Sequence, residues 1–340
     1  MALPKKLSHR LLFGVLLGLG FYVALALWSD VRGIAAALER LSWWVIPAAC
    51  GLSFLNYVVR FAKWQRYLTL LAIRIDAKTS FLIYLSGLSM SVTPGKMGEV
   101  FKSWLLKKVT GTPISRSAPI VFAERFTDLL GYLLLIAIGG LASAGDYAWI
   151  FWATLALCVV ALCLVGNRAF GDFALRLADK LPVLKRATPK LEVALASTRI
   201  LLAPREILMP TFVSFVGWGL ECTGFWLIAN AIVPDSVPYL FAIFAFALSA
   251  VAGAVAIVFP GGLVITEGFL GTLLRPRYQP AAEATLGLAG DAAREYARSQ
   301  AAGTVILARV CTLWFAVLVG FLAMGLFTRR FGAVEEEPTD

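Results

Sequence analysis

Three ionisable residues fall within one helical turn of an apolar segment. Glu124 and Asp128 share a helix face at a spacing of four, and Arg125 reaches Asp128 at a spacing of three. A charged side chain at the centre of a bilayer costs about 2.5 to 3.5 kcal/mol on insertion scales, so it needs a partner or a watery cavity. The cluster therefore predicts a polar site; the alternative is a helix end whose charges extend to the membrane surface.

Charged residues also interrupt other apolar segments. Glu221 lies in the middle of one, Glu267 follows a Pro-Gly-Gly sequence, and Arg309 lies within the last one. We interpret all of them as members of the same site. For Glu221 and Arg309 the alternative is a buried pair with a purely structural role.

Two loops, 93–99 and 260–267, share an order of residue types: a Pro-Gly break, small residues, and then a glutamate that opens a second half-helix. A helix N-terminus offers unpaired N–H groups and partial positive charge, which suits an anionic group such as phosphate. The side chains expected to take part are Lys96, Glu99 and Glu267. The loop residues expected beside the ligand are Pro94, Gly95, Gly98, Pro260, Gly261 and Gly262.

Nothing in the sequence indicates an ATP site, a metal site or another cofactor. Gly95-Lys96 is not a Walker A loop, because Met90 stands five residues before Gly95 and Met97 follows Lys96. The single histidine, His9, excludes histidine triads, and the five cysteines lie in apolar stretches without metal-binding spacing. We therefore expect no catalytic residues and no enzyme.

Basic and aromatic residues mark the end of the apolar run at 43–62. We assign Arg60 to the site. The others are interpreted as interfacial anchors, as such residues commonly are in membrane proteins; they are Lys63, Trp64, Arg66 and Tyr67.

Composition indicates an all-α integral membrane protein. Apolar residues make up 59% of the 340 and charged residues 15%, with a mean hydropathy of +0.79. Since about 20 apolar residues cross a bilayer, we predict six full spans. They are 11–28, 43–62, 117–141, 147–166, 209–231 and 302–327.

Two further apolar segments are broken and are predicted to be re-entrant hairpins, because lipid cannot satisfy an interrupted helical backbone. The first enters along 81–92 and returns along 100–106; the second enters along 239–259 and returns along 263–274, although 239–259 is long enough to span by itself. Residues 43–141 and 209–327 then form an inverted repeat, joined by an amphipathic cytoplasmic connection at 167–208. Such repeats with broken helices point to a transporter.

Lysine and arginine set the expected orientation. With both termini in the cytoplasm of a bacterial inner-membrane protein, 23 of the 31 basic residues fall on the cytoplasmic side. Residues 275–301 are then expected to lie on the periplasmic side.

The charged motifs together resemble a known family, the flippase-like transmembrane domain of lysylphosphatidylglycerol synthases, which also occurs as stand-alone proteins. The resemblance covers about residues 10–328. It rests on residues 60–64, 93–99, 124–128, and 260–263 with Glu267. It implies movement of a lipid or lipid-linked headgroup between leaflets. The chain ends at residue 340 without a soluble aminoacyl-transferase domain, so we do not expect it to synthesise lysyl-lipid.

We therefore predict translocation of a lipid with an anionic headgroup through a polar cavity near the midplane. The expected ligands are a phospholipid, an aminoacyl-phospholipid or a polyprenyl-phosphate-linked lipid; no nucleic acid is expected, and a homo-oligomer is left open. Two alternatives are an ion-coupled carrier of a small solute and a non-transporting partner of a lipid-modifying enzyme or glycosyltransferase.

Overall fold

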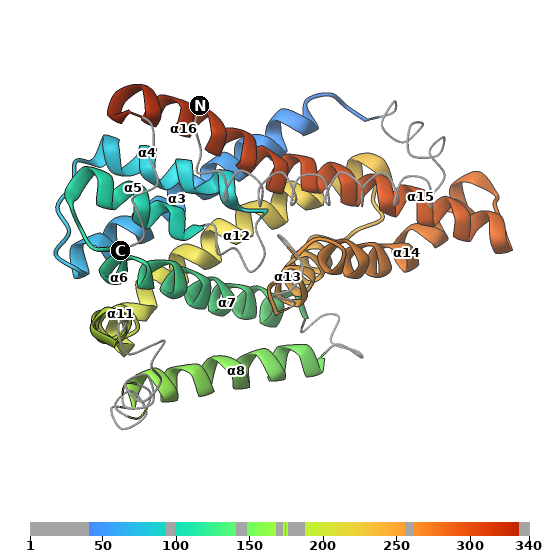
Figure 1. The fold of residues 1–340 in the computed structure, drawn as a ribbon. Coiled ribbons are helices and arrows are strands. Elements are labelled where there is room, and N and C mark those ends of the chain that lie inside the picture. Colours follow the sequence, from blue (N-terminus) through green and yellow to red (C-terminus); the bar gives the residue numbers. More distant parts are fainter. Residues whose placement is uncertain are drawn as a thin grey trace.

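The computed structural model describes residues 41–92, 99–140, 148–167, 173, 175, 188–255 and 262–332. Every regular element in these ranges is a helix (Figure 1), which confirms the all-α class. The predicted span at 11–28 lies outside the described residues. Four of the other predicted spans coincide with helices α3 (Val45–Leu70), α7 (Pro119–Gly140), α8 (Ala148–Gly166) and α12 (Pro204–Ile232). The last one, 302–327, extends from the end of α15 (Gly290–Arg309) through η4 (Val310–Trp314) into α16 (Phe315–Phe331).

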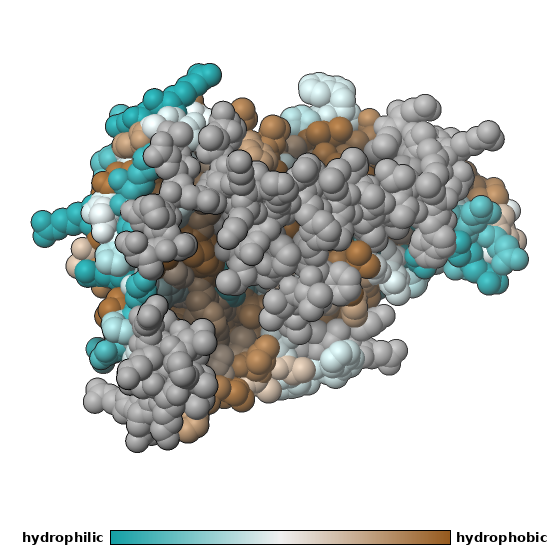
Figure 2. All heavy atoms as spheres, in the orientation of Figure 1, coloured by the Kyte–Doolittle hydropathy of each residue, from teal (hydrophilic) through white to brown (hydrophobic). Residues whose placement is uncertain are grey.

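Three helical segments in the described part of the chain are long and apolar enough to cross a bilayer. They are Val45–Leu70, Pro204–Ile232 and Gly290–Phe331. Helix α7 has 22 residues but carries the charges of the predicted site, and the apolar helices at Phe151–Leu164 and Tyr239–Ala254 are shorter. Figure 2 shows hydrophilic residues at the two ends of the bundle and hydrophobic ones between them, as expected for an integral membrane protein. The number of six spans stays a prediction.

In each broken segment an entering helix packs against a returning helix. The first contains α4 (Ala77–Gly87), the short η1 (Leu88–Met90) and the returning α5 (Phe101–Thr110); the second contains α13 (Tyr239–Val255) and α14 (Ile265–Leu286). Asp76 caps α4 by accepting a 2.9 Å hydrogen bond from the backbone N–H of Thr79. The loop tips at 93–98 and 256–261 lie outside the described residues, so re-entry itself stays a prediction.

Residues 275–301, which are expected on the outer side of the membrane, are largely helical, and their location relative to the membrane stays a prediction. Helix α14 continues to Leu286, and α15 (Gly290–Arg309) returns antiparallel to it after a turn at Gly287 and Gly290, which both have positive φ. Helix α14 continues through Pro276 and Pro280 although proline weakens a helix. Its middle is held by Tyr278, whose hydroxyl lies 3.2 Å from the Ala229 carbonyl oxygen and 2.9 Å from Thr304 Oγ1.

The packing partners of the two halves mirror each other. Helix α3 packs along α12, so the first predicted spans of the two halves meet. Helix α7 packs on α13, and α16 packs on α4 (Figure 1), so the closing span of each half lies against the first hairpin helix of the other. A glycine permits each close crossing: a Cβ at Gly139 would lie 2.6 Å from the Leu240 carbonyl oxygen, and one at Gly320 would overlap the backbone of Ser89.

Two short helices, α6 (Ile114–Ser117) and α11 (Thr188–Leu201), pack near the start of α7, and α8 lies at the edge of the bundle against α7 (Figure 1). The last span is not a regular α-helix throughout. A π-helical segment, η4 (Val310–Trp314), separates α15 from α16 and directly follows Arg309. Single π-turns inside α-helices occur frequently at functional sites.

Candidate functional site

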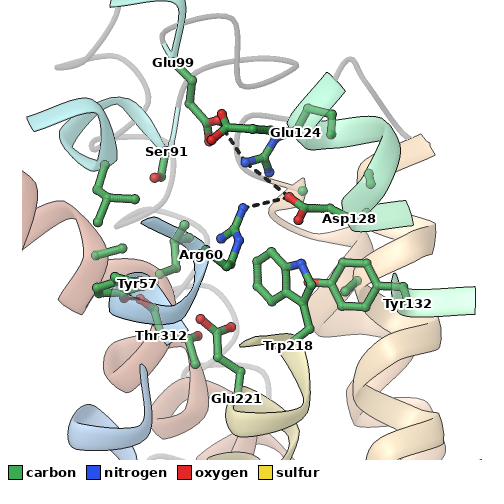
Figure 3. Close-up of a pocket in the computed structure, with 18 of the residues that line it drawn as sticks. Tyr57, Arg60, Ser91, Glu99, Glu124, Asp128, Tyr132, Trp218, Glu221 and Thr312 are labelled. Carbon is green, nitrogen blue, oxygen red and sulfur yellow. Dashed lines mark hydrogen bonds and ion pairs between the residues drawn. The ribbon is translucent and has the colours of Figure 1, made fainter. Parts of the chain in front are cut away.

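A cavity of about 400 Å³ lies between helices from both halves of the chain. Helices α3, α4, α7, α12, α13 and α16 all contribute to its walls. Its lining includes charged side chains from segments far apart in the sequence, several of which Figure 3 shows facing one another. They are Arg60, Glu99, Lys102, Glu124, Arg125, Asp128, Glu221 and Arg309.

Asp128 on α7 is the centre of a buried network. Its Oδ2 lies 2.7 Å from Nη2 of Arg60, and its Oδ1 lies 2.7 Å from Nζ of Lys63. Ser214 on α12 donates to Oδ1 at 2.9 Å, and Arg125 lies 3.4 Å from Oδ2. One carboxylate thus holds three cations and joins α3, α7 and α12.

Glu124 lies one turn before Asp128 and binds a different cation. Its Oε2 pairs with Nζ of Lys102, which comes from the second helix of the first hairpin. The Lys102 ammonium also lies 4.9 Å from the ring centroid of Trp64 and 5.4 Å from that of Tyr84. Lys102 reaches this position by passing over Gly87, because a Cβ there would overlap the Cγ and Cδ of the lysine.

The glutamate after each hairpin break binds an arginine of a later helix in the same half. Glu99 pairs with Arg125 at 2.9 Å, and Glu267 pairs with Arg309 at 2.7 Å. Both carboxylates are buried, and each pair connects the returning part of a hairpin to the helix that begins the closing span. The two halves therefore carry the same type of ion pair.

Aromatic rings and Glu221 form the wall on the α12 side. The rings of Trp218 and Tyr132 stack at a centroid distance of 4.8 Å, and the guanidinium of Arg60 lies 4.5 Å from the Trp218 ring. Figure 3 shows Arg60 between Asp128 and Glu221. Glu221 accepts a 2.7 Å hydrogen bond from Nδ2 of Asn56, which joins α12 to α3.

Opposite charges balance one another within this site. Removing a single charge would leave its partner uncompensated in a region shielded from water, which is costly. The described cations are Arg60, Lys63, Lys102, Arg125 and Arg309, and the described carboxylates are Glu99, Glu124, Asp128, Glu221 and Glu267. In the part of the chain that the structure describes, no three His, Cys, Asp or Glu side chains come together as a metal site requires.

The structure brings most of the predicted residues together. Seven predicted side chains and Gly262 line the cavity, and Glu267 lies behind Arg309 as its partner. Glu124 and Asp128 are buried, so the alternative of charges that extend to the surface is wrong. The structure pairs Arg309 with Glu267 and Glu221 with Asn56. The remaining predicted residues lie outside the described ranges; they are Lys96, Pro94, Gly95, Gly98, Pro260 and Gly261.

The interpretation of Lys63, Trp64 and Tyr67 as interfacial anchors is wrong. All three are fully buried. Lys63 binds Asp128 and Ser214, and the Trp64 indole donates to Ser80 Oγ at 3.0 Å. Of this group Arg66 alone remains partly exposed, and it pairs with Glu206 at 2.5 Å.

Sequence reasoning missed Lys63 and Lys102 as members of the site. A signal was available for Lys63, because it follows Arg60 at a spacing of three and so shares its helix face. Lys102 stands among apolar residues of α5 that are buried, namely Phe101, Leu105 and Leu106. A lysine on the apolar face of an amphipathic helix is a sign of a buried partner.

Comparison with known sequences identifies the family. A search against curated individual proteins found no match. Residues 15–320 match the family model described as the lysylphosphatidylglycerol synthase TM region, a membrane domain associated with lipid handling. The match covers all of the site and nearly all of the described helices. The chain therefore belongs to the lysylphosphatidylglycerol synthase TM-region family.

Proposed function

We propose that the protein translocates a lipid with an anionic headgroup across a bacterial inner membrane, while the acyl chains stay in the bilayer. The observation that carries the proposal is the charged cavity enclosed by helices of both halves, inside a bundle with an apolar exterior. Because a bilayer opposes the passage of a charged headgroup, a lined polar route lowers that barrier.

The cations of the cavity suit a phosphate group. Arg60 and Arg125 present planar guanidinium groups that bind phosphate with two parallel hydrogen bonds, and Lys102 adds a compact positive charge. The carboxylates Glu99, Glu124 and Asp128 neutralise these cations when the site is empty. A bound phosphate replaces one of these carboxylates as the partner of an arginine or lysine.

The mirrored packing supports an inverted repeat that alternates between two openings. Each hairpin is fastened to a later helix by one glutamate–arginine pair, Glu99–Arg125 in the first half and Glu267–Arg309 in the second. Loosening one pair while the other stays closed opens the cavity on one side at a time, as alternating access requires. Both termini and the 167–208 connection then face the cytoplasm.

The volume of the cavity is also compatible with a different transport function. About 400 Å³ is the size of a pocket for a small ligand, so an ion-coupled carrier of a soluble anionic solute fits the same cavity. An accessory role beside a lipid-modifying enzyme predicts no transport by the isolated protein.

Transport in reconstituted vesicles tests the proposal. Vesicles that contain fluorescent phosphatidylglycerol are exposed to a membrane-impermeant quencher, and the loss of inner-leaflet fluorescence reports translocation. We expect wild-type protein to translocate the lipid. Lys102→Ala and Arg309→Ala are expected to slow it about tenfold or more, the equivalent of ~1.4 kcal/mol. Arg294→Ala, a change at the exposed Arg294–Asp291 pair, serves as the matched control. Equal rates of fluorescence loss in vesicles with and without the wild-type protein would reject translocation of this lipid.

A further inference from the structure

We propose that a lateral portal beside α7 admits the headgroup of an anionic phospholipid from the bilayer, with one of its acyl chains lying against Phe122. This inference rests on the proposed function and names its route of entry. The portal is formed by Phe122, Arg125 and Leu129 on α7 and by Ala250 and Ala254 at the end of α13.

The cavity reaches the outside of the bundle along one face of α7. Phe122, Arg125 and Leu129 follow one another at spacings of three and four, so they share a helix face, and all three line the cavity. Phe122 is 47% exposed, and the side chain of Arg125 is 27% exposed. The same side chains therefore contact both the cavity and the surroundings of the protein.

The opposite side of the portal comes from α13. Gly139, at the far end of α7, contacts Leu240 and Phe244 at the start of α13, so the two helices meet closely there. Towards their other ends both helices line the cavity, where α13 contributes Ala250 and the exposed Ala254. Both residues are alanines, whose side chains end at Cβ and so occupy little of the space at the cavity wall.

The order of residues from outside to inside matches the order of groups in a phospholipid. Phe122 lies only three residues after the start of α7 at Pro119, about 4.5 Å along the axis. In this proposal its ring lies near the boundary between headgroups and acyl chains, where aromatic side chains are favoured. Arg125 follows one turn deeper, and its Nη2 is shared between Glu99 at 2.9 Å and Asp128 at 3.4 Å. A phosphate that displaces one of these carboxylates meets Arg125 first and Arg60 and Lys102 next.

The cavity holds the headgroup and excludes the chains. Its volume of about 400 Å³ is near the lower end of the range for small-ligand pockets, so the chains of a bound phospholipid remain outside the bundle. Phe122 is more exposed than Leu129, the other apolar side chain of the portal on α7.

Photocrosslinking tests the portal with a control on the same helix. Phe122, Leu134 and Ile138 are each 47% exposed on α7, but only Phe122 lines the cavity, and the other two point to another face. The photoreactive p-benzoylphenylalanine is introduced in place of Phe122, Leu134 or Ile138. Each protein is reconstituted in phosphatidylcholine vesicles with a minor fraction of phosphatidylglycerol, and the attached lipids are identified by mass spectrometry.

We expect phosphatidylglycerol to be enriched several-fold over its bilayer fraction at position 122 and to match that fraction at 134 and 138. Arg125→Gln should remove the enrichment at 122 and leave the two control positions unchanged. Attached lipid of equal composition at all three positions overturns the portal. If translocation persists in that case, the proposed function stands and entry lies elsewhere; enrichment without translocation supports the portal and counts against the proposed function.

Discussion

Glu267 accepts a 2.7 Å hydrogen bond from Nε of Arg309, and this ion pair joins the start of α14 to the end of α15. The carboxylate side chain is fully buried and that of the arginine is 11% exposed. Because water reaches neither group freely, loss of one partner leaves an uncompensated charge inside the bundle.

Arg309→Gln should therefore destabilise the fold by about 3 to 5 kcal/mol, the cost of breaking one member of a buried pair. A thermal unfolding scan in detergent would show this as a lower midpoint temperature. Arg294→Gln changes an exposed pair with Asp291 and should leave the midpoint unchanged. The double variant Glu267→Gln/Arg309→Gln should recover part of the loss; no recovery would show that the arginine acts through other contacts.

Asp128→Asn should lower stability more than Glu124→Gln does. The sequence predicts Arg125 as the charged partner of Asp128, and the structure adds Arg60 and Lys63. Neutralising Asp128 leaves three neighbouring cations without their shared carboxylate, whereas Glu124→Gln affects the pair with Lys102. Comparison of folded yields and midpoint temperatures tests this order. The reverse order would mean that Lys102–Glu124 is the main electrostatic support of α7.

Lys63→Ala should slow lipid translocation about tenfold or more, equivalent to ~1.4 kcal/mol, because it removes a buried cation from the Asp128 network. Arg66→Ala, one turn further along the same helix, removes a partly exposed cation paired with Glu206 and should have little effect. The rates are compared in reconstituted vesicles at equal amounts of monodisperse protein. Equal rates for both variants would assign Lys63 a structural role only.

Labelling from each side of the membrane tests the orientation. In a cysteine-free background, Ala284→Cys near the end of α14 should react with an impermeant maleimide added outside intact cells. Arg205→Cys at the start of α12 should react only after the cells are opened. Both positions are exposed, whereas Ala282 nearby is fully buried and would not report topology. Labelling of Ala284→Cys only in opened cells would contradict the inverted hairpins.

Local sequence patterns predicted much of the helical framework. Long apolar runs located α3, α7, α8, α12 and α16, because a chain in lipid must satisfy its backbone hydrogen bonds within a helix. The spacing of Glu124, Arg125 and Asp128 also predicted their common site on α7. These features depend on neighbours within a few residues, which a single sequence displays.

The partners of the charged residues could not be predicted in the same way. Lys63 contacts Asp128 across 65 residues and Ser214 across 151, and no local spacing encodes such contacts. A lysine beside tryptophan near a helix end is equally typical of an interfacial anchor. The extension of α14 through Pro276 and Pro280 likewise depends on tertiary contacts of Tyr278 with α12 and α15.

Gly87→Ala should weaken the first hairpin and slow translocation. The lysine chain of Lys102 passes directly over Gly87 to reach Glu124, and an added Cβ would overlap its Cγ and Cδ, which lie near the fixed backbone of α5. The displaced lysine would lose Glu124 and the rings of Trp64 and Tyr84, and overpacking of this kind typically costs about 1 to 3 kcal/mol.

Gly271→Ala on α14 is the matched control, because a Cβ there meets no atom within 4 Å. Alanine also favours a helix over glycine by about 1 kcal/mol, so the control should be neutral or stabilising. Thermal midpoints and translocation rates are measured for both variants. A Gly87→Ala protein as stable and as active as the control would show that Lys102 can reach Glu124 by another path, and that the glycine is not required to admit the lysine.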